Sequence, residues 1–378
     1  MKIALVHDQL HEFGGAERVF LNLKKIFPEA DVFTAYHTPS QLDKFAPDWK
    51  SWKLISSWVQ KIPFISRLAS PLRFLDPWIW ESFDLSAYDL VISSSGGHMC
   101  KGIITRPETM HISNIHHQPR YLYYYQTAMN WQRFLPVKIY GYLINHFLRL
   151  WDYVGSQRPN FLIANSEETK RRIKKFYRRD ATVIYPPVQI SKEMLSFNPK
   201  PKTYYVTLSR LVGSKHIDLL IEAAKKEKFK LQIIGTGKDE EYLKTIADEH
   251  IEFLGRVEDD KLYDIYSKAK AFLNGAVDEE FGIAQIEAMS YGLPVIAFAS
   301  GGHLETVKDG VNGYLFDELS VGSLLLAIDK LERLPKDEYL KICKNSQVEA
   351  EKYSEDKFAA SINKFVTSHA RVTRSRID

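Results

Sequence analysis

The second half of the sequence alternates short apolar runs with segments of helical period, and this alternation constrains the fold more than any other feature. Two helical stripes are formed by Ile217, Leu220, Ile221 and Ala224, and by Leu262, Ile265, Tyr266 and Ala269. The strand-like runs cover residues 204–208, 231–234, 251–254, 271–273, 294–298 and 313–316. Strand and helix in strict alternation predict an α/β fold with a parallel, doubly wound sheet.

The first half begins in the same way. A strand-like run at residues 3–6 is followed by a Gly14-Gly15 turn and by a segment of helical period. That segment carries Val19, Phe20, Leu23, Ile26 and Phe27. Further strands are expected at residues 31–34, 90–93, 110–115 and 161–164. The first half is therefore predicted to be a second Rossmann-like unit.

The length of 378 residues suits two domains of roughly 150 to 200 residues each. Between the halves lie Tyr185-Pro186-Pro187-Val188 and Asn198-Pro199-Lys200-Pro201. Two prolines in a row continue neither a helix nor a central strand, so the hinge is placed there. We expect an N-terminal, acceptor-side domain of residues 1–187 plus about 357–378, and a C-terminal, donor-binding domain of residues 188–356.

Charge and cysteine content exclude several classes. A net charge of +4 over this length does not indicate a dedicated nucleic-acid binder. Two cysteines, Cys100 and Cys343, build neither a disulfide framework nor a cysteine-rich zinc site, and favour a reducing cytoplasm.

The first apolar run is too short for a signal peptide. Residues 134–154, the best candidate for a membrane span, are interrupted by charged and polar residues. Any membrane contact is therefore expected at the membrane surface.

Residues 278–289 carry the strongest signal for a site. A strand's end becomes a helix near Gly282, and Glu279 and Glu287 stand eight positions apart. The N–H groups and dipole of such a helix start favour an anion by about 0.3–2 kcal/mol, and Gly282 lets it approach the backbone. Glu279 can accept hydrogen bonds from sugar hydroxyls, and Glu287 from ribose hydroxyls. An acidic first turn without any ligand explains the spacing equally well when it is taken alone.

Two cations follow the strand at residues 204–208. Arg210 comes directly after this strand and Lys215 stands five residues later. At the carboxyl end of a parallel strand, where open α/β sheets bind ligands, two cations neutralise a leaving diphosphate. Each is read as a solvated side chain when taken singly, so the combination with the carboxylates carries the argument.

These segments, in their order along the chain, resemble the retaining glycosyltransferases of group 1, also called family 4. The matching segments are Gly14-Gly15-Ala16-Glu17-Arg18, Asn165-Ser166, Tyr185-Pro186-Pro187-Val188, Ser209-Arg210-Leu211 with Lys215, Gly235-Thr236-Gly237, 279–287, Gly301-Gly302 and Glu305-Thr306-Val307. The ordered set is far more specific than any one member. The resemblance implies the GT-B fold, in which two Rossmann-like domains face each other across a cleft.

The resemblance also implies roles for single residues. Donor-binding positions are Gly14, Gly15, Arg210, Lys215, Gly235, Glu279, Phe281, Gly282, Ile283 and Glu287. Of these, the two cations hold the diphosphate, Glu279 the donor sugar, the amides of 281–283 its phosphate, and Glu287 the ribose. Glu280 departs from the commoner glycine and resembles the Glu-Asp-Phe-Gly form of polysaccharide-assembly mannosyltransferases. GDP-mannose is therefore the first donor expected.

The N-terminal half supplies the other candidates. The Gly14-Gly15 turn presents backbone N–H groups to an anion, or is a turn without a ligand. Residues 115–121 resemble the family's His-Thr-Pro-x-Arg-Tyr segment, which places His116 near the reacting sugar, through its imidazole or its backbone carbonyl. Together with Glu279, Arg210 and Lys215, His116 completes the expected catalytic set. His117 replaces it if the register shifts by one.

His98 lies one place later than the histidine of the family's Ser-Ser-x-His-x-x-x-Lys-Gly loop, which puts its role in doubt. A zinc site built from His7, His98, His116 and His117 is disfavoured. No pair has the i, i+4 spacing of helix-borne ligands, and no carboxylate is seen to recur with them.

Aromatic residues point to the acceptor side. All seven tryptophans fall between Trp49 and Trp151, with lysines and arginines interleaved. This pattern indicates an interfacial helix near anionic lipid, or an aromatic core with solvated cations. A second basic cluster at residues 170–179 is read as a solvated helix face rather than as a nucleic-acid footprint, because no nucleic-acid motif accompanies it.

The sequence thus predicts transfer of a hexose, with mannose first, from a nucleotide sugar to a glycolipid or polyprenyl-linked acceptor in cell-surface polysaccharide or lipopolysaccharide assembly. No metal, cofactor or nucleic acid is expected, and the place is cytoplasmic, peripheral on the inner face of the membrane. The alternatives are a nucleotide-sugar-binding subunit without activity, and a GT-B epimerase or phosphorylase.

Overall fold

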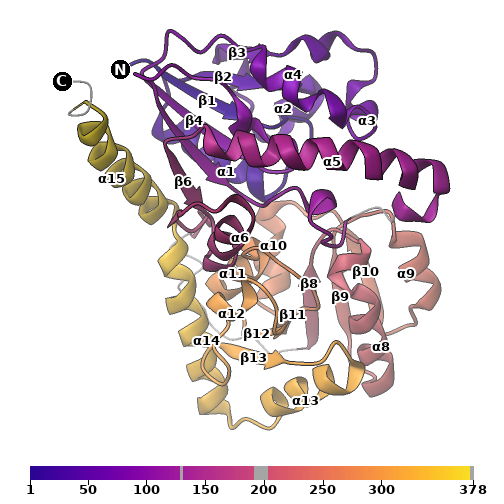
Figure 1. The fold of residues 1–378 in the computed structure, drawn as a ribbon. Coiled ribbons are helices and arrows are strands. Elements are labelled where there is room, and N and C mark those ends of the chain that lie inside the picture. The colour runs from indigo at the N-terminus through magenta and orange to yellow at the C-terminus, as the bar shows by residue number, and fades with distance from the viewer. Residues whose placement is uncertain (128–130, 191–202, 375–378) are drawn as a thin grey trace. The chain divides into compact units, whose positions relative to one another are not determined.

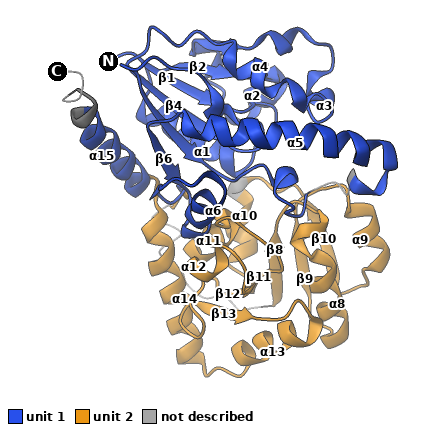
Figure 2. Ribbon diagram, viewed as in Figure 1, with its two compact units in different colours: residues 1–187, 356–378 blue, residues 188–355 orange. Residues whose placement is uncertain are grey.

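A computed structural model describes residues 1–127, 131–190 and 203–374. The chain divides into two compact units, coloured separately in Figure 2. Unit 1 comprises Met1–Pro187 and Asp356–Asp378, and unit 2 comprises Val188–Glu355. The division falls inside the first proline-rich segment, and the second one, 198–201, lies outside the described residues.

Unit 1 is built on a seven-stranded parallel sheet in the order β3-β2-β1-β4-β5-β6-β7 (Figure 1). The strands are β1 (Ile3–His7), β2 (Asp31–Thr34), β3 (Leu54–Ser56), β4 (Leu90–Ser95), β5 (Met110–Ile115), β6 (Phe161–Ala164) and β7 (Thr182–Val183). Every residue of β4 and β5 is buried, as expected for central strands of a sheet covered on both faces.

The helices of unit 1 come from the N-terminal half of the chain and from its C-terminal part. They are α1 (Gly15–Ile26), α2 (Pro39–Phe45), α3 (Ile65–Leu68), α4 (Asp76–Glu81), α5 (Leu135–Gln157), α6 (Glu167–Tyr177) and α15 (Glu355–Arg374). From α15, Phe358, Ile362 and Phe365 join the same buried cluster as Leu5 and Phe20. This apolar contact makes the C-terminal helix part of the first unit.

Unit 2 is built on a six-stranded parallel sheet in the order β10-β9-β8-β11-β12-β13. The strands are β8 (Tyr204–Leu208), β9 (Leu231–Ile234), β10 (Ile251–Gly255), β11 (Ala269–Asn274), β12 (Val295–Phe298) and β13 (Gly313–Phe316). The helices are α8 (Ile217–Glu227), α9 (Glu240–Ile246), α10 (Asp259–Tyr266), α11 (Ile283–Ser290), α12 (His303–Thr306), α13 (Val321–Glu332) and α14 (Lys336–Ala350). The predicted α/β class with parallel sheets is confirmed in both units.

One predicted helical stripe was assigned wrongly at its end. Ala269 belongs to β11, where it pairs with Tyr204, and not to the helix that contains Leu262 and Tyr266. That helix ends at Tyr266, and the N–H of Ser267 closes its last turn on the carbonyl of Tyr263. A buried alanine suits a helix and a strand equally, so apolar spacing alone could not separate the two.

Helix α5 contains residues 135–154 of the segment that was the best candidate for a membrane span. Among the described residues, no helix combines the length and the apolar character needed to cross a bilayer. The helix instead has one buried and one exposed side, and residues at Gly141, Leu148, Asp152 and Gly155 form the buried one.

Candidate functional site

In unit 2, the loops that follow β8 and β9 lie against each other at the carboxyl edge of the sheet. The N–H of Ser209 donates to the carbonyl of Ile234 at 3.0 Å, and the N–H of Leu211 donates to that of Thr236 at 3.0 Å. Gly235 has φ +129°, and a Cβ there would lie 1.9 Å from the carbonyl oxygen of Ser209. Only glycine allows this approach, so Gly235 fixes the loop that carries Arg210.

The next loop brings two predicted residues together. Lys215 follows β8, and Glu279 lies between β11 and α11. Lys215 Nζ donates to Glu279 Oε2 in an ion pair whose side chains are 18% and 17% exposed. The backbones also meet, since the N–H of Val277 donates to the carbonyl of Ser214 at 3.0 Å. A cation and a carboxylate are thus held side by side where a ligand of an α/β sheet binds.

Helix α11 begins where the sequence placed it. Gly282, at φ +89°, is the N-cap, and Ile283 is the first helical residue. Gly282 has no side chain to cap the first N–H groups, which are therefore available to an anion. Phe281 is buried, with its ring 5.1 Å from that of Tyr353, and so anchors this loop in the core. Glu287 lies on α11, half-buried.

The loop after β12 supports Glu279 from behind. The N–H of Gly302 donates to the carbonyl of Glu279 at 2.8 Å. Gly301 has φ +57°, and a Cβ there would lie 2.2 Å from the same oxygen. His303, which sequence reasoning missed, is fully buried beside this loop and bonds the carbonyl of Phe298 through Nδ1 at 2.8 Å. Burial lowers the pKa of His303, opposed by the charge of Glu279.

Arg210 is not part of this contact. It is exposed on the loop after β8, and its guanidinium makes no hydrogen bond or ion pair with any of the described residues. Of the predicted cations, the structure therefore joins Lys215 to Glu279 and leaves Arg210 beside them on a loop fixed by Gly235. An exposed guanidinium at this edge is free to turn toward a bound phosphate.

Unit 1 contains a chain of buried polar side chains. It starts at the Gly14-Gly15 turn, where Gly14 is the N-cap of α1, Gly15 is its first residue, and the N–H of Gly14 donates to Glu17 Oε2 at 2.9 Å. Glu17 Oε1 lies 3.5 Å from His7 Nε2, and His7 Nδ1 lies 2.9 Å from Ser94 Oγ. Ser94 Oγ in turn lies 2.7 Å from His116 Nε2.

His116 is therefore engaged from two sides. Its ring nitrogen bonds Ser94, and its backbone carbonyl accepts from Asn165 Nδ2 at 2.9 Å. Burial lowers the pKa of His116 to about 3, so its imidazole is neutral at pH 7. A neutral, fixed histidine at the end of a chain that begins at the glycine turn suits a hydrogen-bonding role better than a proton-transfer role.

Comparisons with known proteins identify unit 2. Residues 191–350 match the family of glycosyl transferases group 1. Unit 2 is a group 1 glycosyltransferase domain. The resemblance to group 1 stated from the motifs is thereby confirmed. The chain is 26% identical over 256 residues to the GtfA subunit of a peptide N-acetylglucosaminyltransferase of Streptococcus pneumoniae, which covers 64% of this chain and 48% of that protein. The match thus spans about half the length of that curated relative.

Solved structures agree on the fold. Anabaena HepE in complex with UDP and glucose superimposes with a TM-score of 0.69 at 19% identity, over 97% of this chain and 100% of that one. The lipopolysaccharide outer core galactosyltransferase WaaB, in its apo form, gives a TM-score of 0.65 at 18% identity, over 98% and 100%. At these identities the likeness shows the fold alone, and that fold is GT-B.

The displaced histidine of the group 1 pattern has its own partners. His98 Nδ1 lies 3.2 Å from Asp76 Oδ1, and the backbone N–H of His98 donates to Asp8 Oδ2 at 2.9 Å. Burial opposes protonation of this ring, but the Asp76 carboxylate raises the pKa of His98 overall. His117 lies against the same loop, because a Cβ on Gly96 would stand 3.0 Å from His117 Nε2.

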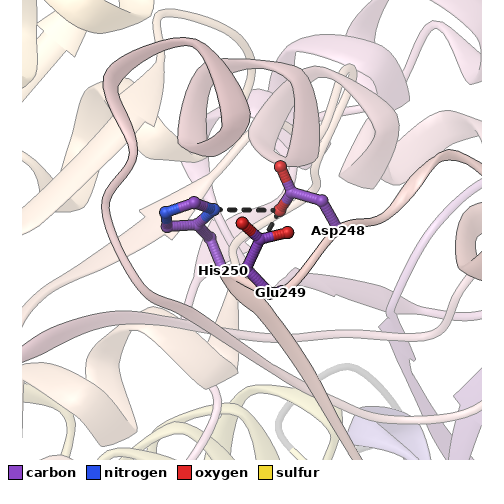
Figure 3. Close-up of side chains that lie close together, drawn as sticks. All are labelled: Asp248, Glu249 and His250. Carbon is purple, nitrogen blue, oxygen red and sulfur yellow. Dashed lines mark hydrogen bonds and ion pairs between the residues drawn. The ribbon is translucent and has the colours of Figure 1, made fainter.

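The reason given against a zinc site from these histidines was partly wrong. Carboxylates do accompany them, since Glu17 lies beside His7 and Asp76 beside His98. Within residues 1–127, 131–190 and 203–374, the group with metal-ligand spacing is instead Asp248, Glu249 and His250, drawn in Figure 3. These residues precede β10 and so lie at the amino edge of the strands. The candidate site lies at the carboxyl edge, so this group is not part of it.

The basic cluster of α6 is largely neutralised within unit 1. Arg171 and Arg172 both bond Glu168, and Lys174 bonds Asp180 at 2.7 Å. Arg172 is buried, so its stem packs in the unit rather than facing a partner. These ion pairs favour the interpretation of α6 as a solvated helix surface over its interpretation as a nucleic-acid-binding surface.

Acid is expected to unfold unit 1 through its buried histidines. Burial lowers the pKa of His111 and of His116 to about 3, from 6.5. Between these values the unfolded chain binds protons that the native state excludes, so stability is lost as pH falls, by up to about 1.4 kcal/mol per pH unit for each group. Urea unfolding at pH 7.5 and pH 5 measures this slope. His116→Gln should make it shallower, whereas His146→Gln, at an exposed position of α5, should leave it unchanged.

Proposed function

We propose that this chain is a retaining glycosyltransferase, which transfers a hexose from a nucleotide sugar to a glycolipid or polyprenyl-linked acceptor. The observation that carries the proposal is the contact of Lys215 with Glu279 in the loop before α11. This contact places a cation for a diphosphate beside a carboxylate for sugar hydroxyls, within a group 1 domain.

The proposed mechanism depends on charge. As the bond between the anomeric carbon and the phosphate oxygen breaks, Lys215, Arg210 and the α11 amides stabilise the leaving nucleoside diphosphate. When the donor binds, before this step, Lys215 exchanges its partner Glu279 for phosphate, and Glu279 turns to the sugar hydroxyls. The acceptor hydroxyl attacks the same face of the sugar and gives its proton to the departing phosphate. His116, neutral and fixed by Ser94, hydrogen-bonds a hydroxyl of the sugar.

Two nucleotide sugars are candidates for the donor. Glu279-Glu280-Phe281-Gly282 resembles the mannosyltransferase form, which favours GDP-mannose. HepE was solved with UDP and glucose, which favours UDP-glucose as the second candidate. The lipid-linked acceptor is supported by the structural neighbour WaaB, which is a galactosyltransferase of the lipopolysaccharide outer core. The GtfA relative is instead a peptide N-acetylglucosaminyltransferase subunit, which makes a peptide the second candidate acceptor.

The function is tested by incubating the purified chain with GDP-mannose, UDP-glucose or UDP-N-acetylglucosamine, and with a polyprenyl-diphosphate-linked sugar or a serine-rich peptide. We expect transfer from a hexose donor to the lipid-linked sugar, with the anomeric configuration retained by NMR. Donor binding without any transfer supports the binding-subunit alternative. Conversion of the donor in the absence of acceptor supports the epimerase or phosphorylase.

Metal removal is expected to leave turnover unchanged within about two-fold. The charges of Lys215 and Arg210, with the positive end of α11, supply what a divalent cation supplies to a diphosphate elsewhere. The measurement compares initial rates in an excess of EDTA with initial rates in added Mg²⁺ or Mn²⁺. A loss of most activity in EDTA that Mn²⁺ restores would contradict this part of the proposal.

We place the enzyme on the inner face of the cytoplasmic membrane, since its donor is made in the cytoplasm and its acceptor carries a lipid. The cationic and aromatic residues of unit 1 support this location.

A further inference from the structure

Helix α5 exposes an apolar stripe along one side. Leu135, Ile139, Leu143, Phe147, Leu150 and Val154 are each more than half exposed. Their spacing of three or four residues places them on a single side of the helix. The opposite side holds Gly141, Leu148, Asp152 and Gly155, which face the unit. The stripe runs about 29 Å along the helix axis.

The exposed charges of α5 and of the segment that precedes it have one sign. Between Arg120 and Gln157 the sequence contains a single carboxylate, Asp152. Asp152 is fully buried, where Lys101 forms an ion pair with it and Tyr123 Oη donates to it at 2.6 Å. Among the described residues, the solvent-facing charged side chains of α5 and of the segment that precedes it are therefore cations, such as Arg133 and Lys138.

The stripe continues onto the preceding segment of unit 1. Tyr140 Oη of α5 donates to the carbonyl of Pro71, in the stretch between α3 and α4 (Figure 1). Phe64, directly before α3, is 74% exposed, and Trp78 of α4 is 61% exposed. Lys61 lies before α3 and Arg67 lies within α3. Apolar, aromatic and cationic side chains thus occupy adjoining segments.

We propose that the α5 stripe, with Phe64, docks on a membrane surface that contains anionic lipid. Contiguous apolar exposure on this scale marks an interaction surface. The cations that flank it complement anionic headgroups, and the aromatic side chains suit the boundary between headgroups and acyl chains. Glu81 of α4, an exposed carboxylate beside α5, is paired with Arg158. The helix lies in that boundary because Lys138, Arg149 and Asp152 prevent it from crossing. The inference rests on the proposed function for its purpose, which is to bring the enzyme to a lipid-linked acceptor.

The test measures co-sedimentation of the full chain with vesicles of phosphatidylcholine, alone or with phosphatidylglycerol. Binding is expected to the anionic vesicles and to weaken with salt. Leu143→Glu with Phe147→Glu should reduce it by at least about tenfold. Leu326→Glu is the matched control, because Leu326 is an equally exposed leucine on α13 in unit 2, 68% against 62% for Leu143. It should bind as the wild type does.

Two results would overturn the proposal. One is wild-type binding by the α5 double variant with an unchanged circular dichroism spectrum. The other is a wild-type dimer, without lipid, that becomes a monomer in the double variant, because the stripe would then cover a second copy of the chain. Donor binding without vesicles separates this question from the enzyme's function. The α5 variant should retain it, whereas its absence in the wild type refutes the proposed function and leaves the vesicle result standing.

Discussion

Replacing Lys215 by alanine is expected to lower kcat by about 10²- to 10³-fold, the usual effect of removing one preorganised group that stabilises developing charge. Lys215 donates to Glu279 in a half-buried ion pair, so the variant also leaves that carboxylate without this cation. Negative charge beside a departing diphosphate then opposes the reaction. Initial rates with saturating donor and acceptor give kcat, and the donor titration gives KM. We expect the larger change in kcat, because the diphosphate gains charge as it leaves.

Lys244 offers the control for this experiment. It forms an ion pair with Glu240 at 2.8 Å on the surface of α9, in the same unit as Lys215. An exposed pair of this kind contributes little to stability, and it lies away from the candidate site, so Lys244→Ala should leave kcat unchanged. Equal kcat values for the two variants would remove Lys215 from the chemistry. If Lys215→Ala also bound donor normally, the reading as a binding subunit would gain.

The sequence could place Lys215 and Glu279 in one site because of a general property of parallel sheets. The two residues are 64 positions apart. They follow β8 and β11, which are neighbours in the sheet. The carboxyl ends of parallel strands share one edge, so residues just after two such strands meet there. The partner of Lys215 in the absence of ligand was not predictable, since loop side chains choose partners by tertiary contact.

The strands were predictable where they form an apolar run of four residues or more. The bounds of β2, β5, β6, β8, β9 and β13 agree with the apolar runs. The strands β3 and β7 were missed. They lie at the two edges of the unit 1 sheet and contain three and two residues, which is too short to form a recognisable run.

The polar chain of unit 1 gave no signal in the sequence. His7 and Ser94 are register partners on β1 and β4. In the sequence, His7 ends an apolar run and Ser94 is the middle one of three serines, so nothing marks the two as partners. Only the paired sheet reveals that Ser94 connects His7 to His116. The same limit explains why the carboxylates beside His7 and His98 were overlooked, because Glu17 and Asp76 come from helices elsewhere in the chain.

The aromatic segment of unit 1 contains both buried and exposed aromatic side chains. Trp80 is fully buried in the core, as an aromatic-rich interior requires. Trp78, two residues earlier on the same short helix, is mostly exposed. Composition cannot separate these two residues, since burial depends on which side of the helix faces the sheet.

Gly301→Ala is expected to lower turnover by about 10²-fold and to destabilise unit 2. A Cβ at this position would lie 2.2 Å from the carbonyl oxygen of Glu279. The backbone of Glu279 must therefore move, and its hydrogen bond from Gly302 is lost or lengthened. A displacement of about 1 Å in a catalytic group costs on the order of 10²-fold in rate. Steady-state rates and urea unfolding of the same preparation measure both effects.

Gly310→Ala is the control that separates two effects of Gly301→Ala, the strain of a positive φ and the contact of the new Cβ with the carbonyl oxygen of Glu279. Gly301 and Gly310 have similar φ values, +57° and +70°, but a Cβ on Gly310 meets nothing within 4 Å. Both variants lose about 1 to 2 kcal/mol because alanine disfavours this left-handed region. Only Gly301→Ala also pushes on Glu279. If the two variants lose the same stability and Gly301→Ala keeps full turnover, the position of Glu279 does not govern the reaction, and the site has to be sought elsewhere in unit 2.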